Sequence, residues 1–373
     1  MVSTYTSYRM IAADMTRSLQ QVEKQPMVER ETKYYLENIG KVKSIDDFVS
    51  NTRLFKYAMK AMGLQDMDYA KAFIKKALEG GIKDNDSFAN KLTDKRYSEF
   101  VKTFNFFAYG EDATIYNPTQ QGTATRYQLE AVKAGVSPDN PTLKAQVDDY
   151  LENIRDVKSI DDFLADDSLL NFALKAYGLS DYIGDKDTIR KVLEGGVTDP
   201  NSFANKQSST QLKDFAAAFD FATHGEETTT WSAARQPIVD KYARQTLEEN
   251  AGQQSEGVRL ALYFQRKASS LTGPYQILAD KALGQVVRTA LGLPDGMAQA
   301  DIEIQASMLE KRLDFDDFQD PAKVDKFLAR FTTMWEIKNG SPAMRASPAV
   351  LFSQPAEFGI STDMLLQLQQ LRK

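Results

Sequence analysis

Two identical acidic pentapeptides are the first candidates for acid–base chemistry in this sequence. Each reads SIDDF, and together they place Asp46 beside Asp47 and Asp161 beside Asp162. Carboxylate-based hydrolysis needs two carboxyl groups that converge on one bond. Neighbouring side chains on a helix point about 100° apart, so these pairs diverge. We expect them instead to cap helices and to compensate the positive end of the helix dipole.

The single histidine, His224, limits nucleophilic and metal chemistry. The chain has 1 His and no Cys. These counts exclude disulfides, thiol nucleophiles, iron–sulfur clusters and any site within the chain that needs two imidazoles. A serine–histidine–acid triad needs one histidine, but no nucleophile elbow accompanies His224, and its surroundings, THGEET, are typical of a helix end. We therefore predict no catalytic residues.

Glycine pairs and acidic turns are the remaining candidates for phosphate or metal binding. LEGG, at 78–81 and 193–196, places its glycines where a helix ends, whereas a phosphate loop places them before a helix. A calcium loop starting at Asp84 would need Gly at its sixth position and Glu at its twelfth, but these are Ala89 and Lys95. The acidic cluster at 314–320 is typical of a solvated turn. We expect no metal and no cofactor.

Composition narrows the function classes further. The 373 residues carry a formal net charge of −6, which argues against general binding of nucleic acid or anionic membranes. No apolar run approaches the roughly 20 residues that span a bilayer, so we expect no membrane insertion. Asp14 and Arg17 interrupt the N-terminal sequence, which lacks the pattern of a cleaved signal peptide. Export without a cleaved signal stays possible.

An internal repeat is the main organisational feature. YLENIGKVKSIDDF, which starts at Tyr35, returns as YLENIRDVKSIDDF from Tyr150, 115 residues later. ALEGGIKDNDSFANK and VLEGGVTDPNSFANK keep the same offset, which indicates duplication. His224 stands where the first copy has Tyr109. A third, degenerate copy is indicated because LADDSLLNFALKAYGLSD at 164–181 aligns with LADKALGQVVRTALGLPD at 278–295, behind an insertion.

Within each copy the hydrophobic period is helical. Ser44 begins one predicted helical segment, whose apolar stripe runs to Gly63 at its end. A second predicted helix covers 70–79, and a last one carries Phe100, Phe104 and Phe107. The segment between the clear copies contains a predicted helix at 124–134, and no strand is predicted.

The sequence therefore predicts an all-α protein of three tandem related multi-helix modules, flanked by amphipathic terminal helices. The predicted boundaries are an N-terminal amphipathic arm at 1–23, module 1 at 24–115, a linker with a short helix at 116–138, module 2 at 139–230, degenerate module 3 at 231–338, and an extended linker with a C-terminal amphipathic arm at 339–373.

The two terminal arms are the predicted interaction sites. Their apolar residues recur every three or four positions. They are Tyr8, Ile11, Met15, Leu19 and Val22 at one end, and Ile360, Met364, Leu368 and Leu371 at the other. Such arms form helix-to-helix contacts with a partner or a second copy. The alternative is that each arm packs on its own domain.

Three passages resemble a bacterial family of uncharacterised function, domain-of-unknown-function family 1217. They are YRMIAADMTRSL, YYLENIGKVKSIDDFVSNTRLFKYAMKAMGL and KALEGGIKDNDSFANKL. Members of that family are often encoded among flagellar genes, so the resemblance implies a flagellum-associated protein. It brings no catalytic residues.

The resulting expectation is a non-enzymatic structural or assembly component of the bacterial flagellum, acting through protein–protein contacts of repeated modules. The expected partners are flagellar proteins, with a second copy of the chain as a further candidate. The alternatives are a cytoplasmic adaptor or chaperone for flagellar export substrates and, third, a carboxylate-based enzyme. The expected location is the flagellum, reached by signal-less export, with the cytoplasm as the alternative.

Overall fold

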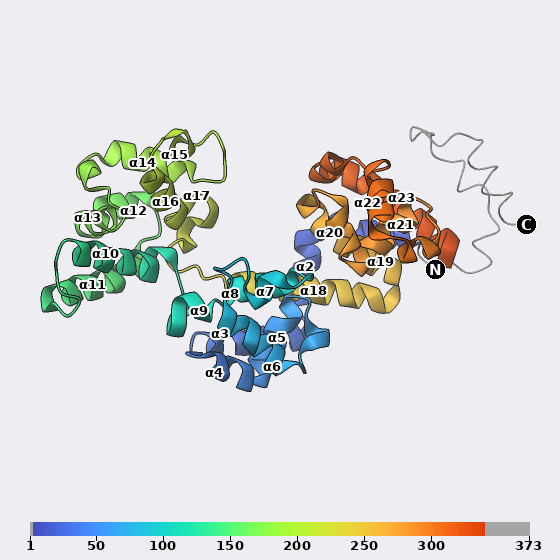
Figure 1. The fold of residues 1–373 in the computed structure, drawn as a ribbon, viewed down its shortest axis with the longest axis horizontal. Helices are drawn as coiled ribbons and strands as arrows, with labels where there is room; N and C mark the ends of the chain where they lie inside the picture. Colours follow the sequence, from blue (N-terminus) through green and yellow to red (C-terminus); the bar gives the residue numbers. More distant parts are fainter. Residues whose placement is uncertain (1–2, 340–373) are drawn as a thin grey trace, which may run out of the picture. The chain divides into compact units, whose positions relative to one another are not determined.

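The protein is helical throughout the part that the structure describes. The computed structural model describes residues 3–339, and every secondary-structure element in that range is helical (Figure 1). This confirms the predicted all-α class. The chain forms two compact units. The terminal unit combines the described residues up to Ser18 with those from Leu247 onward, and the repeat unit is Leu19–Thr246. The chain passes between them within α2 (Met15–Glu23) and α18 (Gln236–Gln254).

The repeat unit contains the two clear sequence copies as two similar sets of helices. The first module consists of α3 (Pro26–Ile39), α4 (Ile45–Ser50), α5 (Thr52–Ala61), α6 (Lys71–Gly80), α7 (Phe88–Lys91), α8 (Arg96–Thr103) and α9 (Phe106–Tyr109). The second consists of α11 (Pro141–Asn153), α12 (Ile160–Ala165), α13 (Asp167–Ala176), α14 (Lys186–Gly195), α15 (Phe203–Lys206), α16 (Thr210–Ala218) and α17 (Phe221–His224). Apart from α8 and α16, corresponding helices start 115 residues apart, so the duplication is one of structure as well as of sequence.

Asparagine side chains interrupt two helical segments that the hydrophobic pattern alone predicts as continuous. Asn51 ends α4 and begins α5, because its side chain accepts a hydrogen bond from the backbone N–H of Leu54. Asn105 begins α9 by accepting from the N–H of Ala108. Such local side-chain bonds compete with the helical ladder. The break before α9 separates Phe107, which is 56% exposed, from the buried Phe100 and Phe104, although the sequence predicted one helix that carries all three.

Buried aromatic rings form the core of each module. In the first, Phe48 packs against Phe104 with ring centroids 4.7 Å apart, and both are fully buried. In the second, Phe163 packs against Phe219 at the same distance of 4.7 Å. Each pair joins the short helix that begins within SIDDF to the end of a helix about 50 residues later in the chain. The duplicated aromatic residues therefore close each module on itself.

The two segments that follow the modules cross, and each is hydrogen-bonded by a tyrosine of the opposite module. The phenol of Tyr35, in the first module, donates to the carbonyl oxygen of Ala234 at 2.6 Å. The phenol of Tyr150, in the second module, donates to the carbonyl oxygen of Thr119, also at 2.6 Å. Each tyrosine thus binds the segment that follows the other module. All four residues are buried, so a lost bond would leave a carbonyl oxygen unpaired in the interior.

The crossing segments also bind each other directly. The side-chain amide of Asn117 donates to the carbonyl oxygens of Thr228 and Trp231, at 2.9 and 2.7 Å. In return, the hydroxyl of Ser232 donates to the carbonyl oxygen of Thr114 at 3.2 Å. Asn117 is 1% exposed. Its amide therefore replaces water for two backbone groups that the crossing buries.

Beyond the crossing, each helix docks on the opposite module. The helix after the first module, α10 (Thr123–Lys133), packs against α13 of the second, where Tyr127 stacks on Phe172 at 3.8 Å. Figure 1 shows α10 beside α11 and α13. The helix after the second module, α18, returns to the first, where Tyr242 stacks on Tyr57 at 3.8 Å. This is a reciprocal exchange of one helix between two copies in a single chain, in the manner of a domain swap.

The terminal unit joins the two ends of the described chain. Its helices are α1 (Thr4–Ala12), α19 (Glu256–Lys267), α20 (Pro274–Leu278), α21 (Lys281–Ala290), α22 (Ile302–Glu310) and α23 (Pro321–Asn339). α1 packs against α19 and α23, and Tyr8, Phe264 and Phe331 are fully buried in the shared core. Within the described range, no helix is long and apolar enough to cross a membrane.

The unit boundaries differ from the six segments expected from the sequence. α10 belongs to the core of the second module through Ala124, although the sequence placed it in a linker. Residues 236–246 belong to the repeat unit, although the sequence placed them in the third module. Residues 3–18 join the terminal unit and do not form a separate arm. Tertiary docking decides these boundaries, and the sequence pattern identifies helices without their partners.

The third copy itself stays a prediction, with local support in one helix. Asp166 and Asp280 each accept hydrogen bonds from two backbone N–H groups at the start of α13 and α21. Gly178 and Gly292 follow the two helices with φ angles of 67° and 65°. These are the helix ends that the alignment at 164–181 and 278–295 pairs.

We predict that replacing either crossing tyrosine by phenylalanine destabilises the repeat unit. Tyr35→Phe and Tyr150→Phe each leave a buried carbonyl oxygen unpaired, which costs about 1–3 kcal/mol. The change is measured as denaturant unfolding of the repeat unit, followed by Trp231 fluorescence in a Trp335→Phe background. Tyr69→Phe is the matched control, because Tyr69 is 77% exposed. Equal stability of Y35F and Y69F would contradict this role of the crossing.

We also predict a loss of stability at high pH that depends on these two tyrosines. Burial raises the pKa of Tyr35 and of Tyr150 well above the ordinary value of 10.0. Their contribution is complete below pH 10 and is lost as the pH rises through the raised folded-state pKa, because the unfolded chain releases these protons first. The expected slope is about 1.4 kcal/mol per pH unit for each tyrosine. Unfolding of Y35F at pH 9 to 11 should show a shallower decline.

Candidate functional site

The SIDDF carboxylates serve helix ends and a helix-to-helix ion pair. Ser44 accepts a hydrogen bond from the N–H of Asp47, whose own carboxylate accepts from the N–H of Lys43. Asp46 instead pairs with Lys75 of α6 at 2.6 Å. The second copy repeats this pattern, with Asp161 paired to Arg190 at 2.6 Å. The predicted capping role is confirmed, and the two carboxylates of each pair act on different partners.

In the second copy, the same contacts favour the charged form of a capping carboxylate. The hydroxyl of Ser159 and then the N–H of Lys158 bind the carboxylate of Asp162 and lower its pKa. Asp162 is therefore ionised at neutral pH, where its charge suits the first turn of α12.

In each copy, the LEGG and FANK segments meet at the turn between two helices. Gly81 ends α6 with a φ of +59°, and a Cβ there would lie 2.7 Å from the ring of Phe107. Asn90 closes the turn by donating to the carbonyl oxygens of Ile82 and Asp84. Asn205 makes the equivalent bonds to Val197 and Asp199. The glycines thus end helices, as predicted.

His224 and the acidic cluster occupy structural positions. The ring of His224 stacks on Trp231 at 4.4 Å, at the end of α17. In the cluster at 314–320, Asp314 and Asp320 accept backbone hydrogen bonds at helix starts, and Asp317 pairs with Lys323. Among residues 3–339, no group of three or more histidine and acidic side chains is placed to hold a metal ion.

The N-terminal arm packs on its own unit up to Ser18. Tyr8 is fully buried and donates to the carboxylate of Asp325 at 3.2 Å, while Ile11 and Met15 are half-buried against the same core. Beyond that point, Leu19 is half-buried and Val22 is buried in the repeat unit. The apolar residues of the described arm thus contribute to two different units, and its role as an interaction site stays a prediction. Ile360, Met364, Leu368 and Leu371 lie outside the described residues.

The second module carries a groove that the sequence reasoning missed. It lies between α10, α11 and α13 and has a volume of about 240 Å³. Its lining residues are Tyr127, Gln146, Asp149, Tyr150, Ser168, Leu169, Asn171, Phe172 and Lys175. Stacked rings form one wall, because Phe172 lies between Tyr127 at 3.8 Å and Tyr150 at 4.1 Å. Comparing the two copies position by position would have pointed to it.

The first module fills the equivalent place with its own side chains. Arg53, Glu31 and Tyr34 stand where the second module has Ser168, Gln146 and Asp149. Arg53 binds Glu31 through two nitrogens, at 2.7 and 3.2 Å, and lies over the ring of Tyr34 at 3.8 Å. This hydrogen bond and charge lower the pKa of Glu31.

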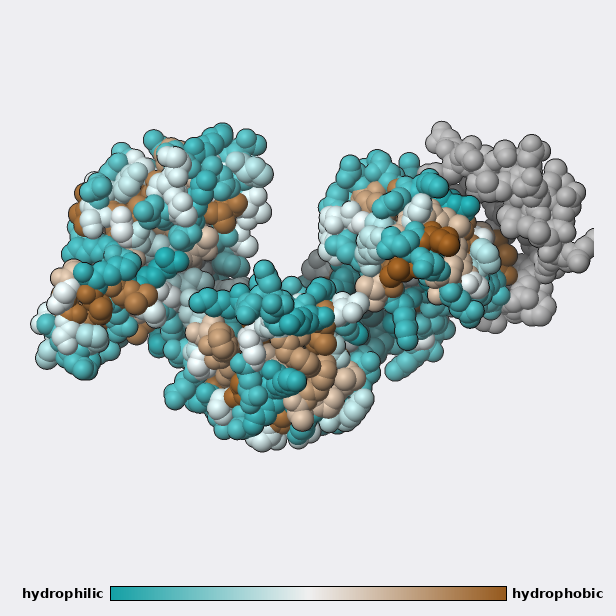
Figure 2. Space-filling model, in the orientation of Figure 1, coloured by the Kyte–Doolittle hydropathy of each residue, from teal (hydrophilic) through white to brown (hydrophobic). Residues whose placement is uncertain are grey.

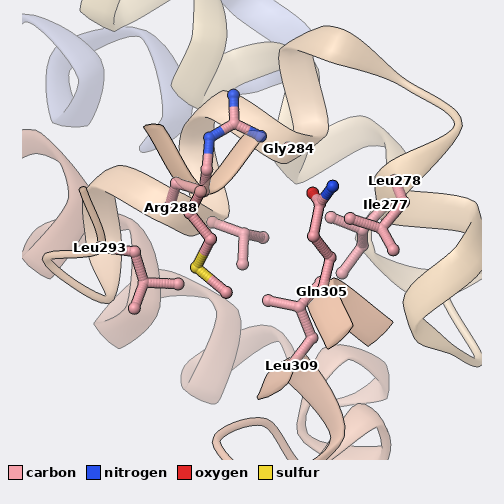
Figure 3. A pocket seen from close by; sticks show the side chains of 9 residues that line it. Ile277, Leu278, Gly284, Arg288, Leu293, Gln305 and Leu309 are labelled. Atoms are coloured by element: carbon pink, nitrogen blue, oxygen red, sulfur yellow. The ribbon is translucent and has the colours of Figure 1, made fainter. Parts of the chain in front are cut away.

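The terminal unit holds a smaller pocket between α20, α21 and α22 (Figure 3). Its volume of about 10 Å³ leaves room for about one water. Figure 3 shows the polar ends of Arg288 and Gln305 on one side, with Leu293 and Leu309 on the other. The aligned second copy has buried Leu170 and Leu174 in place of Gly284 and Arg288.

Hydrophobic surface is also present beside the groove. Leu129 and Val132 of α10 are 55% and 43% exposed. Figure 2 shows a hydrophobic area over the α10 and α11 part of the second module, surrounded by hydrophilic residues. Exposed apolar surface next to a groove is typical of a protein contact site.

Comparison with known proteins gives a family and a related structure. The model of a family described as a protein of unknown function, DUF1217, matches residues 61–187 and again 176–324. The two matches begin 115 residues apart, which agrees with the repeat offset. A crystal structure of protein AGR_C_984 from Agrobacterium tumefaciens is similar, with 35% identity, a TM-score of 0.53 and coverage of 91% of this chain and 97% of that chain. No curated protein matches the sequence.

We predict that the two glycine positions Gly81 and Gly110 respond differently to alanine. Both have positive φ, +59° and +52°, which costs an alanine about 1–2 kcal/mol. At Gly110 a Cβ would have nothing within 4 Å, whereas at Gly81 the ring of Phe107 would have to move. Gly81→Ala should therefore lower the unfolding free energy of the repeat unit more than Gly110→Ala. Equal losses would show that the turn at Gly81 tolerates the added methyl.

Proposed function

The chain belongs to the DUF1217 family of proteins of unknown function, and from that premise we propose that it is a non-enzymatic structural or assembly component of the bacterial flagellum. It acts through protein–protein contacts of its repeated helical modules. The family resemblance carried by YRMIAADMTRSL and the two repeat passages supports the flagellar assignment. In this proposal, the degenerate third module contributes its protein contacts as part of the terminal unit.

The reciprocal exchange is the observation that carries a scaffold role. The crossing joins two copies of one framework into a single body, because each module holds the segment that follows the other. Similar surfaces presented twice allow weak contacts to gain avidity. The acidic pairs of SIDDF support a non-enzymatic role, because Asp46 and Asp47 are already committed to Lys75 and to a helix start.

The groove of the second module favours a second candidate function. A cytoplasmic adaptor for flagellar export substrates would need a site for an extended or helical segment of its client. The groove offers about 240 Å³ beside exposed Leu129 and Val132. This candidate predicts a soluble complex with one unassembled subunit, whereas the structural role predicts recovery with assembled flagella.

The C-terminal arm provides the sharpest test of the structural role. Replacing Ile360, Met364, Leu368 and Leu371 by serine removes its apolar stripe, and we expect loss of the protein from purified flagella and loss of swimming. Denaturant unfolding of the variant should match that of the wild type, which separates a loss of assembly from a loss of folding. Fractionation of flagella, with the protein detected by antibody, measures the first effect, and soft-agar spreading measures the second.

A variant with serine at Gln367, Gln369 and Gln370 is the matched control, because it changes the polar side of the same stretch. Wild-type recovery and swimming are expected for it. If the apolar variant behaves like this control, the arm does not mediate assembly. If the wild-type protein is found in the cytoplasm with one unassembled flagellar subunit, the adaptor function replaces the structural one.

A further inference from the structure

We propose that the groove of the second module binds an arginine side chain supplied by a partner protein. The proposal rests on the proposed function in one respect, namely that the partner is a protein. The groove lies between α10, α11 and α13, and none of its lining residues belongs to the stretch changed in the assembly test.

The lining of the groove suits a planar cation. Tyr127, Phe172 and Tyr150 form a column of stacked rings. A guanidinium is planar and weakly hydrated, and it binds both aromatic rings and carboxylates. Asp149 of α11 lines the same groove and is exposed; its Oδ1 accepts a hydrogen bond from the amide of Asn153 at 3.2 Å, and its other carboxylate oxygen can accept a charge-assisted hydrogen bond from an entering arginine.

The first module shows which side chain can occupy the position that corresponds to the groove. There the chain's own Arg53 occupies the equivalent place, bound by Glu31 and lying over Tyr34. The second module has Ser168 at the position of Arg53, so the internal arginine is missing. It also has Gln146 at the position of Glu31 and Asp149 at that of Tyr34, so the carboxylate of this place lies on Asp149 instead. An arginine from another protein would occupy the place that Arg53 fills in the first module and would meet the carboxylate of Asp149 there.

Charge around the groove favours a cation. Asp148, Asp149 and Glu152 are exposed on α11, and no ion pair to them is found among the described residues. Lys175 also lines the groove, and it is the one cation among these lining residues. The charges of Asp149 and Lys175 balance within the lining, while Asp148 and Glu152 add two carboxylates on the exposed side of α11 beside it, which attract a basic segment.

The test uses the purified full-length protein and three short neutral-capped peptides. Their sequence is Gly-Gly-X-Gly-Gly, where X is arginine, lysine or citrulline, the neutral isostere of arginine. Binding is followed by NMR of methyl groups, with Leu169 as the reporter in the groove. We expect the arginine peptide to bind about tenfold more tightly than the citrulline peptide, the size of one charge-assisted hydrogen bond, with lysine between them.

Substitutions locate the effect within the chain. Asp149→Asn should weaken binding of the arginine peptide about fivefold to tenfold. Asp181→Asn is the matched control, because it removes one exposed carboxylate of the same module outside the groove, and it should change the affinity less than twofold. Equal binding of the arginine and citrulline peptides, or equal effects of the two substitutions, would overturn the proposal.

Exchanging the three residues that differ at this place between the modules tests the proposal independently. Gln146→Glu, Asp149→Tyr and Ser168→Arg together give the second module the first module's own occupant and should abolish peptide binding. The reverse set, Glu31→Gln, Tyr34→Asp and Arg53→Ser, should create binding at the first module, reported by the Leu54 methyl groups. If the filled groove still binds, the proposal is wrong. Unfolding by Trp231 fluorescence checks that each variant is folded.

The two proposals fail separately. Peptide binding is measured on purified protein, so its absence removes the arginine site and leaves the flagellar fractionation result intact. Absence from flagella, with arginine binding retained, removes the structural role and leaves the groove with a partner elsewhere.

Discussion

The repeat unit depends on one constraint, the crossing of the two segments that follow its modules. Tyr35 and Tyr150 hold the opposite segments through buried hydrogen bonds. Because α10 and α18 then dock on the opposite modules, neither copy is complete without the other. A duplication that began as two copies in series has become a single cooperative body. The crossing is buried, so an unpaired backbone group there would raise the free energy of the folded state. This explains why the backbone groups of the crossing are hydrogen-bonded.

The docked helices contribute more than contact area, because each supplies the third ring of an aromatic column. In the first module the column is Tyr35, Tyr57 and Tyr242. In the second it is Tyr150, Phe172 and Tyr127. The same tyrosine that binds the crossing segment therefore also stacks under the docked helix. Crossing and docking are coupled through a single side chain in each module, and loss of one weakens the other.

The copies agree where the framework is made and differ where surfaces are open. The SIDDF caps and the FANK asparagines repeat their bonds in both modules. Arg53, Glu31 and Tyr34 close one module, whereas the second module stays open at Ser168 and Asp149. In the terminal unit, Gly284 and Arg288 open a pocket at positions where the aligned copy has leucine. At these two places the differences between aligned positions lie beside a cavity, where a change of side chain can alter binding while the shared framework is kept.

The sequence by itself determined the helical class, the 115-residue duplication and the local roles of Ser44, Gly81 and Asp47. These are properties of neighbouring residues, and capping and periodicity need no distant partner. Only the tertiary structure decided that α10 and α18 exchange modules, that Tyr8 belongs to a core and that a groove lies beside Tyr127. An amphipathic helix encodes the need for an apolar partner without encoding which partner it meets. That choice depends on burial and hydrogen bonds among residues far apart in the chain, such as Tyr35 and Ala234.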